Sequence, residues 1–359
     1  MNWRRTRAVF LKELRHIVRD VRSLIMAIAL PLVMLLAFGW ALSLDVDRVP
    51  TLVYDADLTP RSREMVERFR GSRFFDVLGY VDGYAPLESA IDRGEALLGV
   101  VIPRGYGAGR NPSVQVVLDG SDSNTAAIAL SYVQALERAG IGRRPRVETR
   151  LRVWYNSTLE SRNYVVPGLI AVILMIIAAL LTSLTIAREW EMGTMEQLLS
   201  TPLRPAEIVF GKMAAFFLLG VTDTLISVAV GLWIFGVPFR GSVVLLAATG
   251  CVFLCGALFW GIFISAATRS QLLAYQLGFI TSFLPAFLLS GFVYSIENMP
   301  PVIQAISHIF PARYFVTTLK GIFLKGVGLE VLWADGAFLV AYSTLVFLLA
   351  NRKMRQKVA

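Results

Sequence analysis

The polar residues with the most regular spacing lie between two long apolar segments. Residues 188–207 read Arg-Glu-Trp-Glu-Met-Gly-Thr-Met-Glu-Gln-Leu-Leu-Ser-Thr-Pro-Leu-Arg-Pro-Ala-Glu, in which Gly193 precedes a helix-like run that Pro202 ends. A short amphipathic helix of this kind is suited to docking into a groove on a partner, whereas an ordinary charged loop is the simpler interpretation. The pattern alone leaves both open. The apolar set of this run consists of Met195, Leu198 and Leu199.

The sequence lacks the usual catalytic and nucleotide-binding patterns. A Walker A loop needs a glycine-rich turn followed by Lys and Ser or Thr, so that backbone amides and the lysine hold phosphates. The Gly211-Lys212 pair is followed by Met213 and has no glycine at the required upstream position. The two histidines, His16 and His308, belong to no metalloprotease motif, and no hydrolase nucleophile motif occurs. We therefore expect no catalytic, cofactor or metal site on this chain.

One acidic residue, Asp223, lies about ten residues inside an apolar segment. A carboxylate within a membrane span is costly and usually faces protein or water. Asp223 could line a translocation path or bind a cation, and it could equally pair with polar groups at a helix interface. Its depth in the segment does not decide between these interpretations.

Long apolar segments dominate the chain, which has 359 residues, 55% of them hydrophobic, and a mean hydropathy of +0.60. Six segments reach the roughly 20 apolar residues that a helix needs to cross a bilayer. Helices are expected because lipid offers the backbone no hydrogen-bond partner, and no alternating pattern indicates a barrel. The predicted fold class is an α-helical polytopic membrane protein with six transmembrane helices and an inserted extracytoplasmic α/β domain. The predicted spans are 23–44, 164–187, 213–239, 241–268, 270–296 and 331–350.

The basic residues next to the spans predict the orientation. Residues 1–22 and the tail 351–359 are rich in Arg and Lys, whereas the short loop between the third and fourth spans has only Arg240. Both termini are therefore expected in the cytoplasm. The net charge of +9 then reflects topology and attraction to anionic lipid, and it is no indication of nucleic-acid binding.

Residues 1–22 are also expected to form an amphipathic helix that lies at the membrane surface. Its basic residues fill the face opposite an apolar stripe. The first span is longer than the apolar part of a signal peptide, so it is expected to stay as an anchor. The stripe consists of Trp3, Phe10, Leu14, Ile17 and Val21.

Residues 45–163 differ from the rest because acidic and basic residues balance there. Apolar runs that alternate with helical patterns predict a small α/β domain on the outer side. A second outer segment, 297–330, has apolar residues at helical spacing between prolines and is too short to span, so we expect re-entrant or interfacial helices. Strands are predicted at 51–54, 74–81, 97–102 and 114–118, helices at 60–70, 87–93 and 123–139, and an extended segment at 146–155.

Several short motifs, in their order relative to the six spans, resemble the ABC-2 type exporter permeases, in particular the subgroup with a large outer domain after the first span. The resemblance covers essentially the whole chain. Its motifs are Lys12-Glu13, Arg19-Asp20, Pro31-Leu32, Phe38-Gly39, Val53-Tyr54-Asp55, Asp119-Gly120-Ser121-Asp122, Val166-Pro167-Gly168, Arg188-Glu189, Gly193-Thr194, Glu196-Gln197-Leu198, Thr201-Pro202, Ser290-Gly291-Phe292, Met299-Pro300 and Pro311-Ala312-Arg313-Tyr314-Phe315.

The resemblance implies a permease subunit that moves amphipathic or hydrophobic, drug-like or lipid-like molecules outward across a bacterial inner membrane. A separate ATPase subunit, which binds ATP and Mg²⁺, would drive it, and a second permease copy or a homologous permease would complete the path. A periplasmic adaptor and membrane lipid are further expected partners. The loop 188–212 would meet the ATPase, and the N-terminal helix would touch it too. The coupling residues implied are Arg188, Glu189, Glu191, Gly193, Thr194, Glu196, Leu198, Leu199, Pro202 and Glu207.

Three other functions are weighed. A membrane-embedded transferase would need a His, Asp or Glu cluster near one membrane face, and no such cluster stands out in the sequence. A carrier that works alone would want inverted repeats with broken helices. A sensor or scaffold, in which the outer domain binds a ligand and the loop signals inward, stays open as the alternative.

Overall fold

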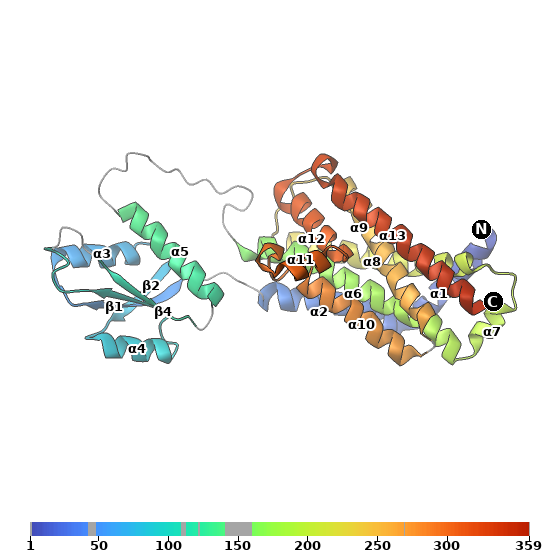
Figure 1. The fold of residues 1–359 in the computed structure, drawn as a ribbon, viewed down its shortest axis with the longest axis horizontal. Coiled ribbons are helices and arrows are strands. Elements are labelled where there is room, and N and C mark those ends of the chain that lie inside the picture. The colour runs from blue at the N-terminus through green and yellow to red at the C-terminus, as the bar shows by residue number, and fades with distance from the viewer. Residues whose placement is uncertain are drawn as a thin grey trace. The chain divides into compact units, whose positions relative to one another are not determined.

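The computed structural model describes residues 2–41, 48–108, 113–120, 123–140, 160–268 and 270–358. The chain divides into a helical unit, Met1–Ser43 with Val153–Ala359, and an α/β unit, Leu44–Arg152 (Figure 1). The predicted extended segment 146–155 and the predicted cap residues of the 123–139 helix, Ser121 and Asp122, lie outside the described residues.

Six helices of the described residues are long and apolar enough to cross a membrane, which confirms the predicted fold class. Their lengths match a hydrocarbon core of about 30 Å at 1.5 Å per residue. They are α2 (Val21–Ala41), α6 (Ser161–Glu191), α8 (Pro205–Trp233), α9 (Val243–Ala267), α10 (Gln271–Leu288) and α13 (Leu329–Val358).

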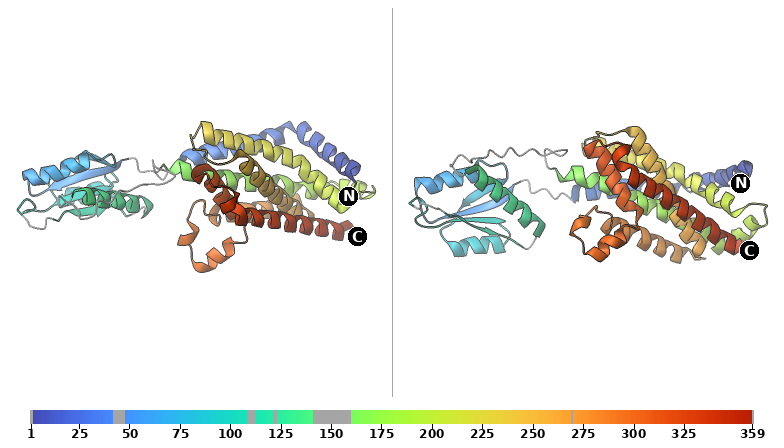
Figure 2. Two further views of the ribbon diagram at one scale, coloured as in Figure 1. Left: turned by 90° about the horizontal axis from the view of Figure 1, so that it is seen from above. Right: turned by 45° about the horizontal axis from the view of Figure 1, so that its top comes forward.

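Helix α6 is the core of the helical unit, since most of its side chains are buried. It packs against α2, α8, α9 and α10, which surround it in both views of Figure 2. Its contact with α9 is partly polar. The Thr182 hydroxyl donates to the Leu258 carbonyl at 3.0 Å, and the backbone N–H groups of Ile186 and Ala187 donate to the Ser265 hydroxyl at 2.9 Å. Hydrogen bonds of this kind join helices where lipid supplies no partner.

Several helix boundaries differ from the predicted spans. Helix α8 begins at Pro205, eight residues before the predicted 213, and ends at Trp233, six residues before the predicted 239. Residues 205–212 therefore belong to a helix and not to the predicted loop 188–212.

Helix α6 runs four residues beyond 187 to Glu191, so Arg188, Glu189 and Glu191 lie in its last turns and not in a loop. Helix α10 ends at Leu288, eight residues before the predicted end, because Gly291 takes a left-handed turn with φ +77°. Helix α13 continues through most of the tail 351–359 to Val358.

The segment between α10 and α13 holds short helices, as its proline-bracketed pattern predicts. They are η1 (Ile296–Asn298), α11 (Pro301–Ser307), α12 (Pro311–Lys320) and the π-helical turn η2 (Gly321–Lys325). Lys320 fixes this segment to the core, since its ammonium donates to the Gly291 carbonyl at 2.9 Å and lies 3.3 Å from the ring centroid of Tyr164.

The N-terminal helix α1 (Trp3–Arg19) is confirmed as a helix, and the break at Asp20 separates it from α2. Its buried side chains are Thr6, Val9 and Glu13, which do not belong to the predicted apolar stripe. They face α8, where a Cβ at Gly211 would lie 2.8 Å from Val9 Cβ. Helix α1 is therefore packed against a span by one face, and its Trp3 side remains exposed.

The α/β unit contains a four-stranded sheet in the order β2–β1–β3–β4. Strand β1 is parallel to β2 and β3, and β4 is antiparallel to β3. The core is formed by one face of the sheet with α3 and α5. The elements are β1 (Val49–Asp55), α3 (Pro60–Arg70), β2 (Phe75–Tyr80), α4 (Tyr84–Asp92), β3 (Leu98–Ile102), β4 (Gln115–Leu118) and α5 (Ser123–Gly140), each close to its predicted range.

The loop after β1 is fixed by Asp57. Its carboxylate accepts from the Thr59 hydroxyl at 2.6 Å and from the backbone N–H groups of Gly105 and Gly107 at 2.7 and 2.8 Å. The Thr59 hydroxyl and these amides hold the pKa of Asp57 below its usual value. The same loop contains Leu58, a residue with positive φ (53°).

The α6–α9 contact predicts a sharp difference between two glycines of α9. A Cβ at Gly261 would lie 2.0 Å from Thr182 Oγ1 and 2.4 Å from the Ala179 carbonyl oxygen, whereas a Cβ at Gly250 would meet nothing within 4 Å. We expect Gly261→Ala to lower the free energy of unfolding by about 1–3 kcal/mol through overpacking. Gly250→Ala should leave it unchanged or raise it slightly.

Thermal unfolding of the two variants in the same detergent compares them directly. Equal unfolding temperatures for Gly261→Ala and the parent chain would contradict the close α6–α9 contact.

Candidate coupling site

The residues predicted to meet a partner lie at the end of the helical unit that also holds both chain termini (Figure 1). Gly193 ends α6 with a left-handed backbone, φ +69°, which is a conformation that glycine adopts without a steric cost. Helix α7 (Thr194–Leu199) follows and lies between α6 and α8 in the sequence. The turn after α7 leads to Pro205, the first residue of α8.

The apolar face of α7 turns toward its own chain, so this face is not free to dock into a groove on a partner. Met195 is completely buried, and Leu198 packs against the core of the helical unit. The exposed side chains on α7 and in the turns beside it include those of Met192, Glu196, Gln197, Ser200 and Thr201. The surface around α7 is therefore mainly polar.

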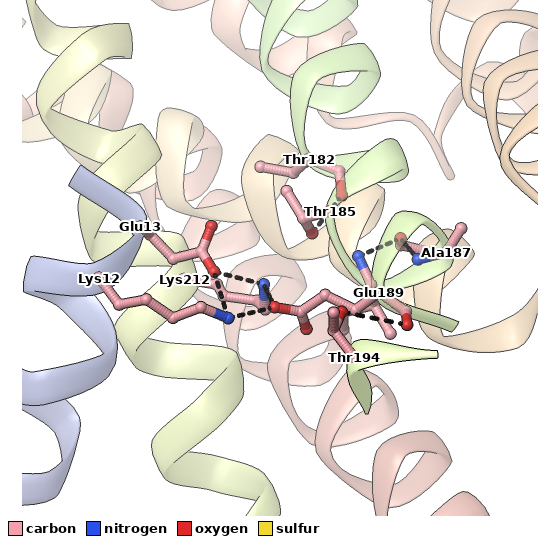
Figure 3. A network of polar contacts seen from close by, with 10 residues as sticks. Lys12, Glu13, Thr182, Thr185, Ala187, Glu189, Thr194 and Lys212 are labelled. Carbon is pink, nitrogen blue, oxygen red and sulfur yellow. Dashed lines mark hydrogen bonds and ion pairs between the residues drawn. The ribbon is translucent and has the colours of Figure 1, made fainter. Parts of the chain in front are cut away.

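Figure 3 shows a network of four charges near Thr194, the first residue of α7, and three of these charges are buried. Lys212 of α8 is 1% exposed, and its Nζ lies 2.7 Å from Glu13 Oε1 and 3.1 Å from Glu189 Oε1. Lys12 Nζ lies 2.6 Å from Glu189 Oε1 and 3.8 Å from Glu13 Oε1. We call Lys12, Glu13, Glu189 and Lys212 the charge tetrad. It joins α1, α6 and α8, and its formal charge is zero.

The three buried members of the tetrad, Glu13, Glu189 and Lys212, depend on one another, whereas Lys12 is about half exposed. Two ammonium groups and two carboxylates compensate one another, so each charge has an opposite charge within 4 Å. Removal of one partner from a buried pair typically costs about 3–5 kcal/mol, because the remaining charge stays dehydrated without compensation. The tetrad therefore holds α1 against α6 and α8.

Glu207 supplies a second connection between α1 and α8. Its carboxylate accepts from the backbone N–H of Asn2 at 2.6 Å and from that of Arg204 at 3.0 Å. These residues are the N-caps of α1 and α8, so one carboxylate serves the positive ends of two helices. The Arg5 guanidinium also donates to the Pro202 carbonyl, which fixes the turn after α7 to α1.

Glu191 connects the same end of α6 to α10. Its carboxylate accepts from the backbone N–H of Gln271 at 2.7 Å and from the Gln271 side-chain amide at 2.6 Å. Arg188 Nε lies 3.4 Å from Gln271 Oε1. The Thr194 hydroxyl makes a long contact, 3.4 Å, with the Glu189 carbonyl.

The structure thus brings together most of the predicted coupling residues, namely Arg188, Glu189, Glu191, Gly193, Thr194, Glu196, Leu198, Pro202 and Glu207. The side chain of Leu199 lies outside the described residues. Asp223 lies elsewhere along α8 and is 2% exposed, and neither of its carboxylate oxygens has a hydrogen-bond partner in the described part of the chain. It borders a small void next to Gly220 and Leu254.

Sequence reasoning missed Lys12, Glu13 and Lys212 as functional candidates. Lys212 does not complete a phosphate-binding loop, and a lysine with a neighbouring glycine at the start of a span needs another explanation. The glycine allows α1 to approach α8, and the lysine pairs with a glutamate 199 positions away in the sequence. The sequence contains one signal that points to these residues. A glutamate and a lysine stand at the edges of apolar segments, where a charge without a partner is costly.

Comparison with known proteins shows the family to which the chain belongs. The family described as ABC-2 family transporter protein matches residues 21–351. The chain is 34% identical to the probable multidrug ABC transporter permease YbhS of Escherichia coli, with 100% of this chain and 98% of that protein covered. It is 33% identical to the probable multidrug ABC transporter permease YbhR over 90% of both chains. It is 26% identical to the inner membrane transport permease YhhJ over 97% of this chain and 96% of that protein. The chain therefore belongs to the ABC-2 family of transporter proteins.

Proposed function

We propose that this chain is the membrane-spanning permease subunit of an ATP-driven exporter whose ATPase is a separate protein. Its cargo would be amphipathic or hydrophobic small molecules that leave the cytoplasm or the inner leaflet of a bacterial inner membrane. The observation that carries the proposal is the charge tetrad, because it joins α1, α6 and α8 close to α7. It makes α1 part of one rigid joint with α6 and α8. The names of the relatives, which describe multidrug permeases, support the same class of cargo.

In this proposal the ATPase contacts α7 on the cytoplasmic side and moves it when nucleotide binding closes the ATPase. The last turns of α6 follow because Met195 is buried and Gly193 makes a tight connection. The tetrad and Glu207 transmit the displacement to α1 and α8, and Glu191 transmits it to α10. A displacement of this kind biases two packings of the spans, one open inward and one open outward.

The proposal also includes both termini in the cytoplasm, the α/β unit outside, and a second permease copy or homologue that completes the path. A periplasmic adaptor that contacts the α/β unit remains part of this hypothesis. Asp223 is proposed to line the path, because Leu181 and Phe216 border both its void and a larger cavity on the side of α1. The alternative function, a sensor or scaffold, predicts an inward signal without transport.

Co-purification and transport separate these two functions. We expect the tagged full chain to retain an ATPase subunit, and inverted vesicles that contain both to accumulate a fluorescent amphiphile only with ATP. Replacing exposed residues of α7, as in Glu196→Lys with Gln197→Lys, should weaken retention of the ATPase. An intact chain that retains no ATPase, or a Met192→Cys variant labelled only from outside the cell, would contradict the proposal.

Gly193 offers a test of the joint that does not depend on side-chain contacts. A Cβ at this position would meet nothing within 4 Å, so a substitution acts only through the left-handed backbone. We expect Gly193→Val to impose about 1–3 kcal/mol of strain and to reduce ATP-driven export. Gly193→Asn, the matched control, should retain export because Asn tolerates this conformation. Equal export by the two variants would show that the turn does not matter for coupling.

The charge tetrad generates a double-mutant prediction. Lys212→Met alone should destabilise the chain by about 3–5 kcal/mol, since two buried carboxylates then share one ammonium. Adding Glu13→Leu leaves the Lys12–Glu189 pair and should restore most of the stability. If the tetrad transmits the motion of α7, the restored double variant remains folded and bound to the ATPase but exports poorly.

Thermal unfolding and vesicle transport measure the two properties separately. Full export by the folded double variant would exclude a coupling role and leave the tetrad with a purely structural one.

A further inference from the structure

A cavity of about 620 Å³ lies between α1, α2, α6, α7 and α8, next to the charge tetrad. This volume falls within the roughly 300–1,000 Å³ of ordinary small-molecule sites. One part of its wall is apolar and belongs to the spans. The apolar residues include Leu24 and Ala27 of α2, Leu181 and Leu184 of α6, and Phe216 and Leu219 of α8.

The other part of the wall is charged. Glu189 Oε2 is buried there without a hydrogen-bond partner among the described residues, whereas free donors belong to two cationic side chains, Arg188 and Lys12. The carboxylates of Glu13 and Glu189 each lie within 4 Å of both tetrad lysines. Asp20 has a partner of its own. By contrast, the Arg188 side chain makes one hydrogen bond in the described part of the chain, a long one of 3.4 Å from its Nε to Gln271 Oε1. The imidazole of His16 has no hydrogen bond or ion pair among the described residues.

The donors of this wall that lack a partner therefore favour an anionic ligand. A guanidinium presents five N–H donors in a planar fork that matches phosphate or carboxylate oxygens. Lys12, about half of whose side chain is exposed, adds a second cation at the same wall. A cationic ligand would find a free oxygen, Glu189 Oε2, but on a carboxylate that already lies beside two ammonium groups, and it would approach Arg188 as a like charge.

The apolar part of the cavity wall indicates the chemical nature of the rest of the ligand. A protein segment of the ATPase would have to enter between spans to reach Ala27 and Phe216, where its backbone would lose water without gaining hydrogen bonds. A hydrocarbon chain has no such requirement, and it gains from leaving water by about 0.8 kcal/mol per methylene.

We propose that this cavity binds one amphiphile with a phosphate or carboxylate head and a hydrocarbon tail. The head lies against Arg188, with Lys12 and His16 beside it. The tail lies among α2, α6 and α8. The molecule is either an acidic membrane lipid or a free amphiphile that the protein carries. This binding site does not depend on the proposed exporter function, because binding is measured without ATP and without transport.

The test uses the full chain in phosphatidylcholine nanodiscs and three probes with the same tail, namely dodecyl phosphate, dodecanol and dodecylamine. Calorimetric titration against empty nanodiscs separates binding to the protein from partition into lipid. We expect saturable binding of dodecyl phosphate, at least about tenfold tighter than that of dodecanol, because a hydrogen bond to a charged group contributes about 1.5–3 kcal/mol. Tighter or equal binding of dodecylamine would overturn the proposal.

Two variants locate the site, and each has a matched control. Arg188→Gln should weaken dodecyl phosphate about tenfold or more while dodecanol changes little. Arg7→Gln, which removes an exposed charge of α1 outside the cavity, should leave both unchanged. Ala27→Phe fills the apolar part and should weaken both probes. Met26→Phe, at a neighbouring position that is 66% exposed, should weaken neither.

Variants that bind dodecyl phosphate as the parent chain does, despite Arg188→Gln or Ala27→Phe, would overturn the assignment. Because each variant alters a different part of the cavity, failure of one to fold leaves the other as a complete test. Nanodiscs with phosphatidylglycerol distinguish the two sources of the ligand. If phosphatidylglycerol competes with dodecyl phosphate, and Arg188→Gln abolishes this competition, an acidic lipid is an occupant of the cavity. If dodecyl phosphate binds equally well in these nanodiscs, the ligand is a free amphiphile.

Discussion

Compensation of charge in a place that water cannot reach is the constraint on which this end of the protein depends. Lys212 is almost completely enclosed, so its ammonium must have carboxylates beside it, and Glu13 and Glu189 must come from two other helices. A helix held by such contacts cannot move away alone, since separation would leave a dehydrated charge without a partner. The tetrad therefore makes α1 a structural part of the helical unit, although its sequence describes a surface helix.

A second feature of the helical unit is the close packing of α6 against its neighbours. Small residues allow this, because a Cβ at Gly261 would collide with Thr182, and a Cβ at Gly278 would lie 2.9 Å from Ser183 Oγ. Backbones that approach so closely leave no soft side-chain layer between α6 and its neighbours. The tight packing along α6 and the tetrad at its end are thus complementary. The tight packing keeps α6 rigid, and the tetrad fixes α1 and α8 to it.

Sequence patterns predicted local elements well and distant partners poorly. Helix α3 occupies the predicted 60–70 because Thr59 caps it and Pro60 begins it, and both signals are local. The charges that begin at Arg188 predict that α6 ends at 187. Helix α6 nevertheless continues to Glu191, since Lys12, Lys212 and Gln271 compensate those charges from remote positions. No local pattern contains that information. The burial of Met195 was missed for the same reason, because its neighbours come from elsewhere in the chain.

The cavity and the tetrad share a wall, and this has a thermodynamic consequence. Three residues have two roles, namely Lys12 and Glu13 of α1 and Glu189 of α6. They hold α1 in place, and they border the proposed binding site. Any ligand that binds more tightly to one position of α1 than to another must shift the helix by its differential affinity. By reciprocity, a partner that binds more tightly to one position of α1 would change the affinity for the ligand by the same factor by which the ligand changes the affinity for the partner. In the proposed mechanism release of the ligand would require no separate gate, because the helices that form the joint also form the site.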